Sequence, residues 1–154
     1  MRSVDSKVKL SWALLITALA VLPGCASVPM ADPAADTQAK GFAAPSAGKA
    51  GVYIFRDETM GAAIKLVVIL DGKILGETAS KTYFHVEVDP GPHEVLGKGE
   101  NDSVAKFNAV AGQLYFIWQE VKMGMFTPRN EVQVVDAGRG KAGVMESKLV
   151  APVK

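Results

Sequence analysis

Two histidines, His85 and His93, and one cysteine, Cys25, are the residues of this chain best suited to catalysis or metal binding. A hydrolase needs a base beside an acid and a nucleophile, and a metal site needs several ligands that converge. His85 alternates with Tyr83 and Glu87, so these three side chains should share one face of a strand. His93 follows an Asp-Pro-Gly-Pro turn, where its ring could hydrogen-bond the loop backbone.

The two histidines are not expected to share a site. If residues 89–92 make a hairpin, Val88 pairs with His93 and His85 lies opposite Leu96, so the two rings point to opposite faces. We therefore expect no metal and no cofactor. A G-x-S-x-G motif and a phosphate-binding glycine loop are absent from the sequence. These features favour a noncatalytic protein, with an envelope hydrolase that uses His85 as the alternative.

The first residues have the organisation of a secretory signal. Three basic residues stand among the first nine positions, and residues 10–22 form an uncharged, mostly apolar run. A membrane-spanning helix needs about 20 apolar residues, so this run is too short to span a bilayer. The sequence predicts a signal peptide over residues 1–24.

The residues after this run are Leu22, Pro23, Gly24 and Cys25. They resemble the lipobox, at which lipoprotein signal peptidase cuts once the cysteine is acylated, although Pro23 stands where a small residue is usual. The resemblance implies that Cys25 is lipidated; the alternative is an ordinary cleavage site with an incidental cysteine. By analogy with lipoprotein sorting, Ala26 favours the outer membrane, with the protein facing the periplasm.

Composition sets further bounds. Residues 1–24 carry three basic residues and one acid, so their removal changes the net charge from +1 to −1. A chain with so little charge has no general attraction for nucleic acid. With Cys25 acylated no thiol is left for disulfides or thiolate metal sites.

Residues 25–49 are rich in alanine, proline, glycine and serine, and we expect a flexible tether there. Residues 50–150 alternate short apolar segments with turn signals such as Asp71-Gly72, which predicts one antiparallel β-sandwich. Residues 64–70 read as a strand covered on both faces, and residues 104–110 and 114–122 as paired neighbours. The tail after Asp136 is expected to form a turn-rich element or an edge strand, because its glycines disfavour a helix.

The order of four motifs is similar to an uncharacterised family of bacterial lipoproteins, the domain of unknown function 2846. The motifs are VYIFR, VVILDGKILGE, KTYFHVEVDPGPHEV and VAGQLYFIWQE, and the resemblance covers about residues 49–150. A related resemblance is to PEGA-type domains, in which D-G and P-G-x-H turns recur on a transthyretin-like sandwich. Both resemblances imply a fold and a location, and neither implies an activity.

Three apolar side chains, Met123, Met125 and Phe126, lie in an expected loop rather than on a periodic face. They are candidates for contact with a partner; the alternative is a loop that packs over one end of the sandwich. Arg56, at the end of a strand, is expected to be a surface charge. The sequence as a whole predicts a membrane-anchored scaffold that binds an envelope protein or glycan; a small-ligand sensor with a pocket between the sheets, lined by Trp118, is a further alternative.

Overall fold

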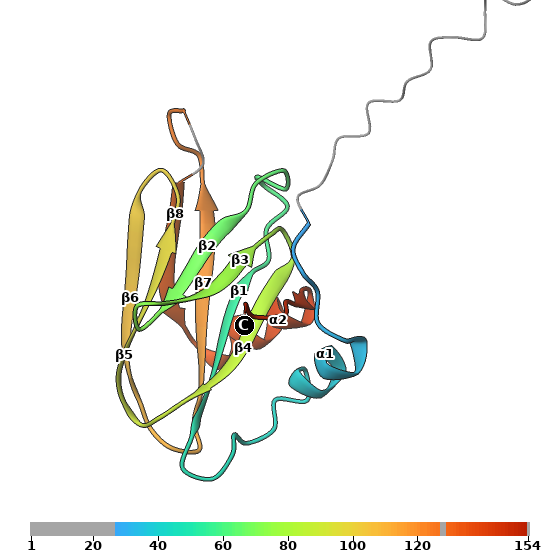
Figure 1. Ribbon diagram of the computed structural model, residues 1–154, viewed down its shortest axis with the longest axis vertical. Helices are drawn as coiled ribbons and strands as arrows, with labels where there is room; N and C mark the ends of the chain where they lie inside the picture. The colour runs from blue at the N-terminus through green and yellow to red at the C-terminus, as the bar shows by residue number, and fades with distance from the viewer. Residues whose placement is uncertain (1–26, 127–128, 154) are drawn as a thin grey trace, which may run out of the picture.

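The computed structural model describes residues 27–126 and 129–153, which form a β-sandwich flanked by two short helices (Figure 1). The helices are α1 (Pro33–Ala39) and α2 (Ala137–Met145). The strands are β1 (Ala50–Arg56), β2 (Leu66–Leu70), β3 (Lys73–Thr78), β4 (Thr82–Val88), β5 (Gly91–Lys98), β6 (Asp102–Ala109), β7 (Leu114–Lys122), β8 (Arg129–Val135) and β9 (Lys148–Leu149). One sheet has the order β8-β7-β1-β4-β9 and the other β3-β2-β5-β6, which confirms the predicted all-β sandwich.

The main core lies between the two sheets. Val52 and Ile54 of β1, Phe84 of β4 and Ile117 of β7 are fully buried there. Every residue of β1 is buried, so β1 is the strand covered on both faces. The sequence assigned that place to residues 64–70; β2 instead alternates buried and half-buried side chains, because only one face of its sheet packs on the core.

The Asp71-Gly72 hairpin between β2 and β3 is confirmed. Asp71 and Gly72 have φ values of 50° and 78°, and the flanking residues Leu70 and Lys73 pair across the turn. Positive φ at both central positions is what a tight type I′ turn requires.

Two other predicted strand pairs are wrong. β4 pairs with β1 and β9, whereas β5 pairs with β2 and β6, so the turn at residues 89–90 crosses from one sheet to the other. The connection from β6 to β7 crosses in the same way. A Pro-Gly turn reverses the chain, but the sequence does not show whether the next strand pairs with the preceding strand or joins the other sheet. The five-stranded sheet is also mixed rather than purely antiparallel, because β1–β7 and β4–β9 are parallel.

The tail after Asp136 folds as helix α2, which corrects the expectation of a turn or edge strand. The Asp136 side chain accepts a hydrogen bond from the Arg139 amide and caps the helix. A Cβ atom at Gly140 would lie 2.1 Å from the Phe116 ring, and one at Gly143 would lie 2.2 Å from the Phe55 ring. The glycines therefore lower helix propensity but allow α2 to pack directly on these rings.

The segment expected to be a tether is part of the fold from residue 28 to residue 49. Val28 is buried in the main core, and Ala31 and Ala151 form backbone hydrogen bonds that tie residues 28–31 to the C-terminal segment. Helix α1 then covers the outer face of the five-stranded sheet, where the Tyr53 hydroxyl donates to the Ala39 carbonyl (2.8 Å). These long-range contacts have no sequence signature. The parts of the chain described by the structure contain no helix that is long and apolar enough to cross a bilayer.

Candidate functional site

A cleft lies between helix α1 with the segment after it and the outer face of the five-stranded sheet. Its volume is about 440 Å³. The cleft is lined by Ala35, Gln38, Ala39, Ala43, Ala44, Pro45, Ser46, Tyr53, His85, Glu87 and Leu149. Four alanines and a proline form the α1 side of the cleft, and His85, Glu87 and Gln38 supply polar groups on its walls.

Tyr83, His85 and Glu87 share the outer face of β4, as the alternating sequence predicts. Tyr83 is buried beneath α1, where its hydroxyl donates to Asp36 (2.9 Å). His85 is half-buried and faces the cleft, and Glu87 is exposed at its rim. This face of β4 is partly covered, because part of the segment expected to be a tether packs against it.

His85 rests on a stack of aromatic rings. Its ring lies parallel to that of Tyr53 at a centroid distance of 4.2 Å, and Tyr53 stacks in turn on Phe116 at 5.2 Å. Burial lowers the pKa of His85, and the charge of Glu87 opposes this only in part. The imidazole is therefore neutral near pH 7 and can both donate and accept a hydrogen bond. Within residues 27–126 and 129–153, neither ring nitrogen has a hydrogen-bond partner.

Glu87, which lies beside His85 on this face, does not hydrogen-bond the imidazole. Its carboxylate accepts a hydrogen bond from the backbone amide of Ser46 (2.8 Å). This bond lowers the pKa of Glu87 and keeps the carboxylate charged. In a catalytic triad the acid hydrogen-bonds the histidine and orients it toward a nucleophile. Here the carboxylate instead fixes the loop that forms the rim of the cleft.

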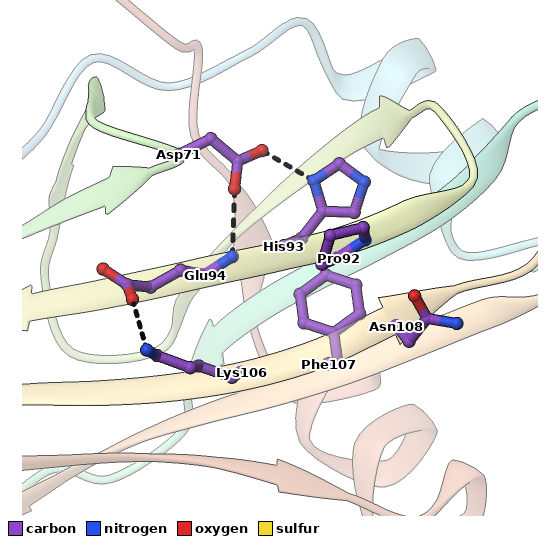
Figure 2. A pocket seen from close by; sticks show the side chains of 7 residues that line it. All are labelled: Asp71, Pro92, His93, Glu94, Lys106, Phe107 and Asn108. Atoms are coloured by element: carbon purple, nitrogen blue, oxygen red, sulfur yellow. Dashed lines mark hydrogen bonds and ion pairs between the residues drawn. The ribbon is translucent and has the colours of Figure 1, made fainter.

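His93 has a structural role in the four-stranded sheet, where its ring faces Asp71 (Figure 2). Its Nδ1 lies 2.6 Å from Oδ2 of Asp71, and its Nε2 lies 2.7 Å from the carbonyl oxygen of Asp89. Burial alone would lower the pKa of His93, but these two bonds outweigh it and raise the pKa. The predicted bond to loop backbone is confirmed, and the ion pair with Asp71 is an addition that the sequence did not reveal.

The His93 clamp joins two turns that are distant in sequence. Asp71 also accepts a hydrogen bond from the Glu94 amide (2.9 Å) through its other oxygen. The adjoining surface depression is shallow and is lined by Asp71, Pro92, His93, Glu94, Lys106, Phe107 and Asn108 (Figure 2). Because acceptors occupy both nitrogens of His93, this imidazole is not available as a general base.

The two histidines lie in different sheets, His85 opposite Tyr53 on β1 and His93 opposite Phe107 on β6. The pairing of His85 with Leu96 that the hairpin implied is therefore wrong, whereas their separation is confirmed. In the residues that the structure describes, no three histidine, cysteine or acidic side chains gather closely enough to hold a metal.

Arg56 is fully buried, which corrects its assignment as a surface charge. Its guanidinium donates to the carbonyls of Ile64 (3.0 Å), Met60 (3.1 Å) and Gly61 (2.7 Å). Burial lowers the pKa of Arg56. The sequence does not indicate this burial, because the carbonyl acceptors belong to the loop after β1, whose path the sequence does not specify.

Trp118 packs in the cluster on the outer face of the five-stranded sheet. It therefore does not line a pocket between the sheets, which the sensor alternative would have required. The Arg139 guanidinium stacks 4.2 Å from its ring and forms a bidentate ion pair with Asp57 (2.7 and 3.1 Å). Helix α2 supplies this arginine, and the helix was itself not predicted.

Met123, Met125 and Phe126 are exposed to 80%, 83% and 88%, in the loop after β7. The predicted exposure of this apolar loop is confirmed; its contact with a partner stays a prediction. Leu22, Pro23, Gly24 and Cys25, together with the signal peptide over residues 1–24, lie outside the described residues.

The fold defines a β-sandwich domain with a surface cleft on its five-stranded sheet. The chain belongs to the family described as "Protein of unknown function (DUF2846)", whose model matches residues 46–133. It is 33% identical over 138 residues to a protein of Haemophilus influenzae named "Uncharacterized protein", an alignment that covers 89% of this chain and 81% of that relative. No solved structure matches the chain. The resemblance to PEGA-type domains is not among these matches and stays a prediction.

Proposed function

We propose that the protein is a noncatalytic lipoprotein of the outer membrane, facing the periplasm, that binds an envelope protein or glycan in the cleft beside helix α1. The observation that carries the binding role is the state of His85. Its ring stacks on Tyr53 and has no hydrogen-bond partner among the described residues, and burial lowers its pKa, which favours the neutral imidazole. A half-buried polar group of this kind is suited to pair with a ligand.

The lining of the cleft indicates the chemistry of the ligand. His85 and the Gln38 amide offer neutral donors and acceptors, and the Glu87 carboxylate offers an acceptor at the rim. Alanine side chains from the α1 region supply small apolar contacts between these groups. Such a surface fits a ligand rich in hydroxyl or amide groups, as glycans and extended peptides are.

The hydrolase alternative has less support from the same geometry. Glu87 hydrogen-bonds Ser46 rather than His85, so His85 lacks the acid partner that would orient it as a base. Substituting His85 with alanine separates the two functions. A binding protein loses affinity for its ligand, whereas an enzyme loses turnover of an envelope substrate while the fold stays intact.

Photo-crosslinking in intact cells tests the cleft directly. A photoreactive amino acid at Ala44, which lines the cleft and is exposed, should give a reproducible crosslink to one envelope protein or to glycan. The same residue at Lys73, exposed on β3 of the other sheet, serves as the matched control. Crosslinks of equal yield at both positions, or none at Ala44, would overturn the proposed binding role.

The lipid anchor needs a separate test. Its support is the resemblance of Leu22, Pro23, Gly24 and Cys25 to a lipobox. Mass spectrometry of the mature protein should find an acylated cysteine at the N-terminus, and a Cys25→Ala variant should leave the outer-membrane fraction. An N-terminus without acyl chains refutes the anchor.

A further inference from the structure

Strand directions bring four connections to one end of the sandwich. Arg56 pairs with Thr82, Lys98 with Asp102, and Lys122 with Arg129, so the loops that follow β1, β3, β5 and β7 all lie beyond these pairs. Figure 1 shows these loops at the same end. We call this end, formed by residues 57–65, 79–81, 99–101 and 123–126, the methionine end.

Exposed apolar side chains gather at the methionine end. Met123, Met125 and Phe126 are 80–88% exposed, and Met60 in the neighbouring loop is 49% exposed. Exposed apolar side chains gathered at one end are typical of a surface that contacts a membrane or another protein.

The loop after β7 projects farthest. β1 ends one residue beyond the pairing of Phe55 with Trp118, whereas β7 continues to Lys122 and pairs there with β8. Three further residues of strand extend about 10 Å. The apolar loop therefore stands on a ribbon above the rest of this end, as Figure 1 shows.

The chain enters the domain at the same end. Ser27 and Val28 lie against the turn at residues 79–81, beside β4. Cys25 is only two positions before Ser27, a distance of at most about 7 Å along the chain. If Cys25 carries the lipid, the folded residues 28–49 leave no tether that could hold the domain away from the bilayer.

The charged groups of the methionine end are largely paired. Lys122 bonds Glu131, Lys81 bonds Glu146 (2.7 Å), and Lys98 bonds Asp102 (3.0 Å). Such pairs leave little net charge with which to attract an anionic surface or an oppositely charged protein. Attraction at this end therefore depends on its apolar side chains.

We infer that the methionine end rests on the membrane that holds the anchor, with Met123, Met125 and Phe126 inserted at the boundary between headgroups and acyl chains. This inference rests on the proposed lipidation of Cys25. In the sheet, β1 lies between β4, beside the chain entry, and the β7–β8 pair that carries the apolar loop, a lateral separation of roughly 12 Å. Lipid and loop form two attachments side by side, which fix the orientation of the cleft relative to the membrane.

Tryptophan quenching in vesicles tests the insertion. The full mature, acylated protein is reconstituted in phosphatidylcholine vesicles with brominated acyl chains, as a Phe126→Trp variant. Val110→Trp is the matched control, because Val110 is 53% exposed in the turn after β6 at the opposite end. Trp118 gives the same background in both variants and in the unsubstituted protein.

The added tryptophan at position 126 should show a blue-shifted emission and lose about half its intensity to bromine, and that at position 110 should show neither change. Uncharged vesicles should suffice, and raising the salt concentration should leave the quenching unchanged. Acylated, vesicle-bound protein with an unquenched position 126 overturns this inference alone. Protein without acyl chains overturns both the inference and the proposed anchor. A tryptophan at position 126 that lipid does not quench, but that becomes protected once envelope proteins are added, would assign the loop to a protein partner. That result would also overturn the inference.

Discussion

The loops at the two ends of the sandwich differ in how their side chains are used. The end opposite the methionine end, formed by residues 45–49, 71–72, 89–90 and 110–113, ties its turns together with polar side chains. There His93 clamps Asp71 to the turn at Asp89, and Lys49 bonds Asp89 (2.7 Å). We call it the turn end. At the methionine end, Arg56 anchors one loop from inside, while the tip of another loop exposes apolar side chains.

The two ends therefore have different roles: polar ties and Arg56 stabilise the fold, whereas the exposed apolar loop is available for contact with another surface. Polar ties at the turn end and the buried Arg56 contribute to the free energy of unfolding, because their loss leaves buried or half-buried groups unpaired. The exposed side chains at residues 123–126 contribute little to folding, since they are nearly as accessible as in the unfolded chain. Substitutions at the two ends should therefore affect different measurements.

The largest loss of stability is expected from Arg56→Met. Three carbonyls of the loop after β1 lose their donor while the surrounding core stays closed. The free energy of unfolding should fall by about 3 kcal/mol or more, measured by urea denaturation. Arg129→Met, at an exposed position of the same end, should change it by less than about 0.5 kcal/mol. Equal effects of the two substitutions would contradict the anchoring role of Arg56.

His93→Gln should cost less, about 1–2 kcal/mol, because it removes one charge-assisted bond and one backbone bond. The cost should depend on pH. Since folding raises the pKa of His93, the stabilisation is fully present below the unfolded pKa of about 6.5 and is lost as pH rises through the folded pKa. Unfolding measured from pH 5 to pH 9 should show the two proteins converging at high pH; a constant difference would refute the charged clamp.

Asp71→Asn tests the partner in the same clamp and should cost about 1 kcal/mol. The amide oxygen can still accept from the Glu94 backbone, but the charge that favours the imidazolium is gone. Proton NMR titration should show the pKa of His93 falling back toward its usual value. An unchanged titration would mean that Asp89, not Asp71, sets the protonation of His93.

The smallest effect on stability is expected when Met123, Met125 and Phe126 are all replaced by serine. The free energy of unfolding should change by less than about 0.5 kcal/mol, because these side chains are exposed. The orientation of the lipidated protein on vesicles should nevertheless be lost, as limited proteolysis or neutron reflectometry can show. Val110→Ser at the turn end is the matched control, and a stability loss of more than 1 kcal/mol from the triple variant would place the loop in the fold instead.

Much of the fold follows from the sequence. Alternation along β4 correctly separates Phe84, in the core, from Tyr83 and His85 on the outer face. The Asp71-Gly72 pair correctly predicts a hairpin, because few residues other than these tolerate two positive φ values. The exposure of Met125 follows from its place between strands without a periodic face.

The candidate site was predicted only in part. His85 and Glu87 were recognised as facing one way, but the wall opposite them is formed by residues 35–46, which read as a tether. Composition rich in alanine and proline is typical of linkers, and helix α1 is only one short element of seven residues. Its position depends on Tyr53 and Tyr83, whose hydroxyls bond it from strands 14 and 47 positions further along the chain.

The sequence by itself determined the local features: the β class, the two faces of β4, the tight turn at Asp71 and the absence of recognisable catalytic motifs. Periodicity and turn chemistry are properties of neighbouring residues, so they can be read from the chain. The tertiary structure decided which sheet each strand joins, the burial of Arg56, the packing of α1 over His85, and the gathering of the apolar loop and the chain entry at one end. Helix α1 is held by residues 14 to 113 positions away, and the sheets join strands that are not neighbours in sequence. Even the nearby acceptors of Arg56 depend on the path of a loop, so no local pattern encodes these features.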